Sequence, residues 1–429
     1  MKKKANTKVH CKISKMPKTT KTTKYILMPL SAWKMHCIKS KMKALVCILW
    51  WGIWGFALGY SANIEVAKAD RSTWIYPIDS AASFDFASKM EMLVFVQHFQ
   101  ALQNLDDTAL QAYIKAKVQN PNLSSMRMYL SRTQAKILAN FRTIAQTQAT
   151  QKLPYDFLPN LKTTMQWEDV LRLSQYATHN LPVQLQAWYK SASAFYTQYL
   201  AEQLRLSALF PRITSEILPL QDSHQDCTAP QHCEQQEILG DTLQDKHFIL
   251  TFDDGPTPKG GNTDKLIALL KTLHIQAMFF VLGENLHKRN DVTQLYTNMI
   301  VGYHGDMHIP HTKPEVYKNA PIQSQNVATL GKKPANTSCY FRPPYGQRDT
   351  QLLQMLKDSG CKVVLWNIDS QDWGHINPQE MYDRIFTLSL LWRSGIILFH
   401  DVHTKSYEIL PKFVKTLQIC GIQFDIPAL

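Results

Sequence analysis

Two adjacent carboxylates, Asp253 and Asp254, stand at the end of an apolar run and directly before a Gly-Pro turn, in the sequence Thr-Phe-Asp-Asp-Gly-Pro at 251–256. Neighbouring residues of a strand point to opposite faces, so a regular strand cannot aim both side chains at one site. A turn at the end of the strand breaks that alternation. The pattern therefore predicts that both carboxylates converge on one metal ion or on one proton.

Two histidines lie downstream at the spacing of one helical turn. His304 and His308 belong to the sequence Gly-Tyr-His-Gly-Asp-Met-His at 302–308, and a separation of four residues brings both imidazoles to one side. Two histidines and a carboxylate form a common zinc site that leaves positions open for water. His311 follows closely and could replace one of the pair as a ligand.

Three further motifs carry side chains suited to acid–base chemistry. Arg342 lies in Phe-Arg-Pro-Pro-Tyr-Gly at 341–346, where two prolines hold the backbone rigid. An arginine beside a carboxylate holds it ionised and lowers its pKa. The motif Ile-Asp-Ser-Gln-Asp-Trp follows at 368–373. His400 ends a fully apolar run, and with an aspartate as its partner it is a credible general acid.

Short apolar runs after residue 246 predict the strands that position these motifs. The runs lie at 247–252, 276–282, 361–368 and 395–399, with others near 338–341 and 421–425, and helical stretches such as 264–273 and 349–359 alternate with them. Such alternation predicts a parallel sheet, either open or closed into a barrel. The active site of these folds lies at the carboxyl ends of the strands, which is where the motifs fall.

The preceding part of the chain predicts a separate all-α region. Apolar residues repeat at helical spacing between 81 and 210, which predicts a helical domain of four or five helices without a catalytic cluster. The repeats are Met126, Leu130, Ile137, Phe141 and Ile144, and then Leu185, Trp188, Ala192, Phe195 and Tyr199. Residues 211–245 read as a polar linker, so we expect the catalytic domain at 246–429.

The formal net charge of +13 comes from the N-terminal tail. Residues 1–43 hold 13 lysines, and no acidic residue occurs before Glu65. The 34 lysines and arginines of the remaining chain balance its 34 aspartates and glutamates. Nothing outside the tail therefore indicates a basic groove for nucleic acid.

The basic tail at 1–43 precedes an apolar run at 44–60 that is close to the minimum length for spanning a bilayer. Lysines before the run place the N-terminus in the cytoplasm and the rest of the chain outside it, in the periplasm or beyond the cell. We expect an uncleaved membrane anchor. A cleaved signal and a secreted protein stay open, because Ala67-Lys68-Ala69 has the small-x-small cleavage pattern and translation from Met42 would give an ordinary signal length.

The chain has eight cysteines, too few for a disulfide scaffold of this size. Cys227 and Cys233 sit in a polar stretch, and outside the cytoplasm a disulfide between them is expected. A zinc site built on this pair fits no common spacing. Cys339, Cys361 and Cys420 lie in or beside apolar runs and are predicted to be plain core residues.

Taken in order, five motifs resemble those of the polysaccharide deacetylases, the NodB-homology group or carbohydrate esterase family four. The motifs are Thr251–Pro256, His304-x-x-x-His308, Arg342–Tyr345, Asp369–Trp373 and Leu398–His400. The resemblance covers residues 246–429. It implies an α/β fold, a distorted (β/α) barrel, which the all-α domain and the N-terminal transmembrane segment precede in this chain.

The resemblance implies that Asp254, His304 and His308 bind a divalent metal, Zn²⁺ in the first place, with Co²⁺, Mn²⁺ or Ni²⁺ as alternatives. This chain departs from the family pattern in the second motif, where Gly305 stands in place of the usual serine or threonine. The hydroxyl that would brace this loop is therefore missing.

Roles in catalysis follow from the same resemblance. Asp253 would be the general base and Arg342 the residue that orients it, while His400 would be the general acid and Asp372 the residue that tunes it. Substrate contacts are implied for three more residues: the backbone N–H of Tyr345 as an oxyanion donor, and Trp373 and Leu398 as walls of an acetyl pocket.

The leading hypothesis is a membrane-attached, metal-dependent hydrolase that removes N-acetyl groups from an N-acetylated polysaccharide: peptidoglycan, a chitin-like polymer or a secreted polyglucosamine. An amide or imide hydrolase acting on a small molecule is a first alternative. A non-catalytic glycan-binding scaffold is a second, although such a protein should lose Asp253 or His400 and this chain keeps both.

Overall fold

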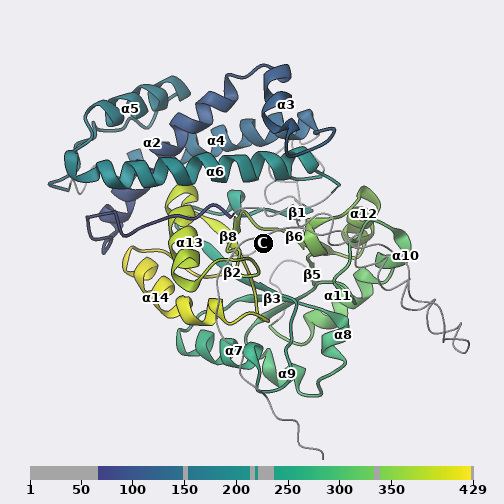
Figure 1. Ribbon diagram of the computed structural model, residues 1–429. Helices are drawn as coiled ribbons and strands as arrows, with labels where there is room; N and C mark the ends of the chain where they lie inside the picture. Colours follow the sequence, from purple (N-terminus) through teal and green to yellow (C-terminus); the bar gives the residue numbers. More distant parts are fainter. Residues whose placement is uncertain (1–65, 148–152, 213–217, 221–235, 333–338, 427–429) are drawn as a thin grey trace, which may run out of the picture. The chain divides into compact units, whose positions relative to one another are not determined.

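The computed structural model of the chain describes residues 66–147, 153–212, 218–220, 236–332 and 339–426 (Figure 1). The predicted tail at 1–43, the predicted membrane run at 44–60 and the predicted Cys227–Cys233 disulfide lie outside the described residues. Within these ranges, no helix combines the length and the apolar character needed to cross a membrane. Residues 64–429 cluster into one compact unit.

The helical region contains five α-helices in the described part of the chain. They are α2 (Ala81–Gln103), α3 (Asp107–Lys115), α4 (Leu123–Thr147), α5 (Trp167–His179) and α6 (Gln186–Leu209), the last preceded by the 3₁₀ turn η2 (Val183–Leu185). Helix α2 is central, because it packs against α4, α5 and α6. All ten apolar residues predicted at helical spacing are buried, which confirms the periodicity.

In the described residues, eight strands form one sheet, and every pairing between them is parallel. The strands are β1 (Glu237–Ile238), β2 (Phe248–Asp253), β3 (Met278–Val281), β4 (Ile300–Tyr303), β5 (Cys339–Phe341), β6 (Cys361–Val364), β7 (Ile368–Asp369) and β8 (Gly395–His400). Their order is β1-β6-β5-β4-β3-β2-β8-β7. The register aligns Asp253 with both Phe280 and His400, so the ends of three strands meet at one edge.

Helices of the α/β part follow the strands along the chain. They are α7 (Asn262–Thr272), α8 (Gly283–Leu286), α9 (Val292–Leu295), α10 (Pro314–Tyr317), α11 (Ala320–Ala328), α12 (Thr350–Asp358), α13 (Pro378–Trp392) and α14 (Lys405–Ile419), with the 3₁₀ turns η3 (Gly240–Thr242) and η4 (Pro344–Gly346). Helix α13 contacts β7 and β8 and also α2 and α4 of the helical region (Figure 1). Its residues from Met381 to Trp392 are all buried, as expected for a helix covered on every side.

The sheet differs from the sequence prediction in several places. Strand β4 lies outside the predicted runs, and the run near 421–425 forms only an isolated bridge at Gln423. The single apolar run at 361–368 forms two strands, and β7 lies next to β8 instead of continuing β6. The predicted linker at 211–245 contributes β1, which pairs with β6 at one edge of the sheet, and η3, which contacts β8. There Leu365 donates a backbone hydrogen bond to Ile238, and a Cβ on Gly240 would lie 1.8 Å from Oδ1 of Asn367.

Cys339 and Cys361 form a disulfide, so the prediction of plain core cysteines is wrong for this pair. The two residues are register partners on neighbouring strands β5 and β6, which places them side by side. Their separation of 22 residues gave no hint of this register. Cys420 is a buried free thiol, as predicted.

Candidate active site

The carboxylate pair lies where β2 ends, as the sequence predicts. Asp253 is the last residue of the strand and is buried, whereas Asp254 adopts a left-handed conformation with φ +80°. This conformation is uncommon for a residue with a side chain, and it reverses the direction in which the second carboxylate points. The Asn285 side chain holds the turn by donating a hydrogen bond to the Asp254 carbonyl at 2.8 Å.

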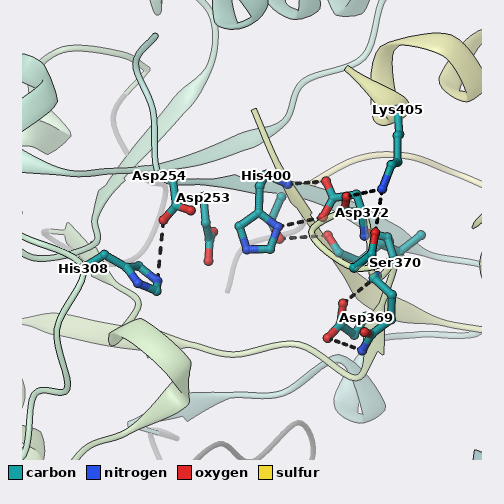
Figure 2. A network of polar contacts seen from close by, with 12 residues as sticks. Asp253, Asp254, His308, Asp369, Ser370, Asp372, His400 and Lys405 are labelled. Atoms are coloured by element: carbon teal, nitrogen blue, oxygen red, sulfur yellow. Dashed lines mark hydrogen bonds and ion pairs between the residues drawn. The ribbon is translucent and has the colours of Figure 1, made fainter. Parts of the chain in front are cut away.

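Asp254, His304 and His308 form the predicted metal-binding trio, with one potential ligand atom of each lying within 4.8 Å of the others. Oδ1 of Asp254 is 3.5 Å from Nε2 of His304 and 3.6 Å from Nε2 of His308, and Figure 2 shows the latter contact. In the described part of the chain this buried oxygen has no hydrogen-bond partner. A cation would satisfy it, so the donor set fits a divalent metal such as zinc.

His304 is held in the orientation that a metal ligand needs. Its Nδ1 donates to the Arg342 carbonyl at 2.7 Å, which directs Nε2 toward Asp254. Burial, helped by nearby His308, pushes the pKa of His304 well below its usual value. The pKa of His308 is also lowered by burial. Both imidazoles are therefore neutral near pH 7, as metal binding requires.

His311, the alternative ligand, lies outside the trio. Its Nδ1 donates to the Ile309 carbonyl at 2.8 Å, and its ring is buried. Gly305 has φ +94°, and a Cβ built there would lie 2.5 Å from Cε1 of His311. The His311 ring thus takes the space into which the serine or threonine of the family pattern would extend.

Arg342 contacts Asp253, which confirms their predicted proximity. Nη1 of Arg342 donates to Oδ1 of Asp253 at 2.8 Å and to the hydroxyl of Thr251 at 2.7 Å. Its guanidinium lies 4.1 Å from the centre of the Phe280 ring and is fully buried. These contacts fix the arginine in one position. Arg342 makes no hydrogen bond to the other carboxylate oxygen of Asp253, Oδ2.

The predicted direction of the Asp253 pKa needs a correction. Burial raises the pKa of Asp253 to about 6, and the opposing effects of Arg342 and His400 offset only part of this rise. A carboxylate with a pKa near 6 is a stronger base than an exposed one and is still ionised at neutral pH. Arg342 therefore limits the rise in the pKa of Asp253 but does not bring that pKa below the value of an exposed aspartate.

His400 and Asp372 form the second charged pair of the site (Figure 2). Nδ1 of His400 donates to Oδ1 of Asp372 at 2.7 Å, and the backbone N–H of His400 donates to Oδ2 at 2.7 Å. Burial would lower the pKa of His400, but the Asp372 carboxylate, with smaller effects from Asp254 and Asp253, outweighs burial and raises the pKa to about 10. The imidazolium form is thus favoured at neutral pH.

Sequence reasoning missed two residues beside this pair. Nζ of Lys405 donates to the carbonyls of Asp372 and Gly374 at 2.9 and 2.8 Å, and so holds the loop that carries Asp372 (Figure 2). Asp401 is buried, accepts a hydrogen bond from the Thr263 hydroxyl at 2.8 Å and has a pKa raised by burial to about 8. Lysine and aspartate near a strand end are too common to be a signal, although the adjacency of His400 and Asp401 was visible.

Each of the three predicted substrate residues, Tyr345, Trp373 and Leu398, lies near a residue of the site. The Tyr345 ring packs edge-on against His308 with centroids 4.4 Å apart, and Tyr345 has φ +58°. Trp373 directly follows Asp372 and is 50% exposed, whereas Leu398 is buried on β8. Their roles as oxyanion donor and pocket walls stay predictions.

Comparison with known proteins supports the same assignment. The family described as polysaccharide deacetylase matches residues 240–364. A peptidoglycan-N-acetylglucosamine deacetylase of Bacillus cereus is 30% identical over 196 residues, which are 42% of this chain and 68% of that protein. The peptidoglycan-N-acetylmuramic acid deacetylase PdaC of Bacillus subtilis is 29% identical over 42% of this chain and 37% of its own length.

A third relative comes from a different kingdom. Chitin deacetylase 1 of Saccharomyces cerevisiae is 33% identical over 172 residues, which are 38% of this chain and 54% of the yeast protein. The chain thus spans between about a third and two thirds of the length of these relatives. Together with the five motifs in this sequence, this similarity identifies the chain as a member of the polysaccharide deacetylase family of hydrolases.

Proposed function

We propose that this protein is a metal-dependent N-deacetylase that acts outside the cytoplasm on an N-acetylated polysaccharide in or near the cell wall. The observation that carries the proposal is the arrangement of two charged pairs at the ends of the adjacent strands β2 and β8. Asp253 of β2 pairs with Arg342, and His400 of β8 pairs with Asp372. The Asp254–His304–His308 trio lies beside them. We further assign the parallel sheet to the distorted (β/α) barrel of the family.

Hydrolysis of an acetamide needs a water molecule that loses a proton and an amine that gains one. A divalent cation bound by Asp254, His304 and His308 would supply Lewis acidity, which lowers the pKa of water and polarises a carbonyl oxygen. Asp253 takes the proton from the attacking water, because its carboxylate is ionised and only Oδ1 is engaged by Arg342. The backbone N–H of Tyr345 stabilises negative charge on the carbonyl oxygen.

His400 completes the reaction as the general acid. Its Nδ1 is engaged by Asp372, so Nε2 carries the proton that is available to substrate. When the C–N bond breaks, Nε2 donates this proton to the departing amine, and acetate and a free amino sugar result. Because the pKa of His400 is raised, its imidazole is protonated at neutral pH and can donate this proton when the amine departs.

The proposed location rests on the sequence and on one disulfide. The lysine-rich tail and the apolar run at 44–60 favour an anchor with the remainder outside. The Cys339–Cys361 disulfide is typical of oxidising compartments. Ala67 and Ala69, the small residues of the alternative cleavage pattern, are buried in the folded unit, and cleavage after Ala69 would remove them, which favours the anchor.

Acetate release from a panel of polymers tests the function and identifies the glycan. Peptidoglycan, chitin oligomers and N-acetylated polyglucosamine should be compared, with the Asp253→Asn and His400→Ala variants as inactive controls. Release from one polymer that both variants abolish supports the proposal. Release only from small amides would favour the amide hydrolase, and glycan binding without acetate release would favour the non-catalytic scaffold.

A further inference from the structure

Arg384 of α13 is fully buried and joins three segments that are far apart in the sequence. Its Nε donates to the carbonyl of Asp369 at 3.1 Å, its Nη1 to the carbonyl of Ala67 at 2.8 Å, and its Nη2 to Oε2 of Glu202 at 3.1 Å. Asp369 ends strand β7, Ala67 lies before the helical region, and Glu202 belongs to α6. One side chain therefore links the helical region to the α/β part.

Glu202 is the charged partner of this buried guanidinium. Its side chain is only 9% exposed, and it also accepts a hydrogen bond from the backbone N–H of Ala67. A buried arginine is costly unless its charge is paired and its donors are satisfied. Glu202 supplies the charge, and the carbonyls of Ala67 and Asp369 accept two further hydrogen bonds.

Asp369, one of the hydrogen-bond partners of Arg384, begins the loop that carries Asp372. Strand β7 has two residues and lies at an edge of the described sheet, where it pairs with β8. The Asp369 carboxylate accepts hydrogen bonds from the backbone and side-chain nitrogens of Gln371 at 2.8 and 2.9 Å, which shapes the turn toward Asp372 (Figure 2). A short edge strand is weakly held by its ladder alone, so the Arg384 contact on its carbonyl matters for the position of the loop.

We propose that Glu202, acting through Arg384, is a positioning residue for the reaction. It fixes the 369–372 loop so that Asp372 meets His400. The helical region is then an integral part of the catalytic unit and not an independent module. This inference rests on the proposed function, since it assigns Glu202 to the orientation of the proposed general acid.

The test compares two substitutions in the full-length protein in detergent micelles. Glu202→Gln removes the charge that holds Arg384 and keeps the shape of the side chain. Asp85→Asn is the control, because Asp85 of α2 pairs with buried Arg393 at 2.9 Å, two residues before the start of β8 and at the opposite end from His400. Arg393 keeps its second carboxylate partner, Asp245, in this variant. Both substitutions break an ion pair between the helical region and the α/β part.

We expect both variants to melt at a lower temperature than the wild type. Only Glu202→Gln should lower kcat for acetate release, by roughly tenfold with KM within about twofold, since small displacements of a catalytic pair reduce the chemical step. A wild-type kcat for Glu202→Gln, or equal losses in both variants, would overturn the proposal. If Glu202→Gln fails to fold, the double variant Glu202→Met/Arg384→Met removes the pair without leaving a buried charge, and the same kcat loss is expected.

A crystal structure of each variant gives a readout that does not depend on activity. The distance between Nδ1 of His400 and Oδ1 of Asp372 is 2.7 Å here, and it should lengthen beyond about 3.2 Å in Glu202→Gln but not in Asp85→Asn. An unchanged distance refutes the positioning role. A wild-type protein that releases no acetate refutes the proposed function instead, and the two failures are thus distinguishable.

Discussion

Asp372 and His400 are joined by two hydrogen bonds, one to the ring Nδ1 and one to the backbone N–H of the histidine, each 2.7 Å long. The carboxylate therefore fixes both the rotation of the imidazole and the place of its backbone. It also carries the charge that outweighs burial in setting the protonation of the ring.

Asp372→Asn should shift the alkaline limit of activity. The variant keeps a side chain of the same shape but lacks the charge that raises the pKa of His400, so we expect this pKa to fall by about one to three units. The measurement is kcat for acetate release between pH 6 and 11, where the falling limb should move to lower pH. A cation in the trio would lower the pKa of His400 in both proteins, so the comparison and not the absolute pH is decisive.

The same pair makes a prediction for stability. His400 has a pKa of about 10 in the folded protein against 6.5 in the unfolded chain, so the folded state binds the proton more tightly. The stabilisation is fully present below pH 6.5 and is lost as pH rises through about 10. The melting temperature should therefore fall over this range in the wild type, and by less in Asp372→Asn. Parallel curves for the two proteins would contradict the assignment.

Arg342→Met should move the acidic limit of activity. Arg342 offsets part of the rise in the Asp253 pKa, so its loss should raise that pKa above 6, and a higher pH would be needed to ionise the base. The rising limb of kcat should shift upward by about one unit or more. Arg348→Met is a suitable control, because Arg348 is equally buried and pairs with Glu237 on β1. A similar shift in both variants would show a general effect of removing a buried arginine.

Metal binding should depend on His308 and not on His311. His308→Ala removes a member of the trio, and we expect the bound zinc measured by mass spectrometry to fall from one equivalent to a small fraction. His311→Ala should retain the metal, because the ring of His311 lies outside the trio. Chelation of the wild type should abolish acetate release, and Zn²⁺ or Co²⁺ should restore it. Metal loss in His311→Ala alone would reverse the ligand assignment.

Much of the site was predictable because each motif follows an apolar run. Parallel strands bring their carboxyl ends to one edge, so Asp253 and His400 had to lie close once β2 and β8 were neighbours. The strand β4 was not recognised, because its four residues include a glycine and a tyrosine and merge with the histidine motif. The position of β7 beyond β8 could not be read, since nothing in the run at 361–368 marks where one strand stops.

Other features depend on how deeply a side chain is buried and on how neighbouring strands align, and a sequence states neither. The pKa of Asp253 is set chiefly by burial, whereas the sequence showed only its arginine partner. The Cys339–Cys361 disulfide depends on the alignment of β5 with β6. Glu202 lies on a helix whose pattern is that of an ordinary amphipathic core helix, so its contact with Arg384 had no local signal.

Gly305 and His311 should behave as a coupled pair. In Gly305→Ser the new Cβ meets the His311 ring and the residue must keep φ +94°, so we expect a loss of about 1–3 kcal/mol in the free energy of unfolding. Adding His311→Ala opens the space and should recover the steric part, leaving the cost of the backbone conformation. Thermal or urea unfolding of the two single variants and the double variant gives the coupling energy, which should be at least about 0.5 kcal/mol. Strictly additive effects would mean that the glycine is required by its backbone conformation alone. A coupling of at least this size would show that the His311 ring excludes a side chain at position 305.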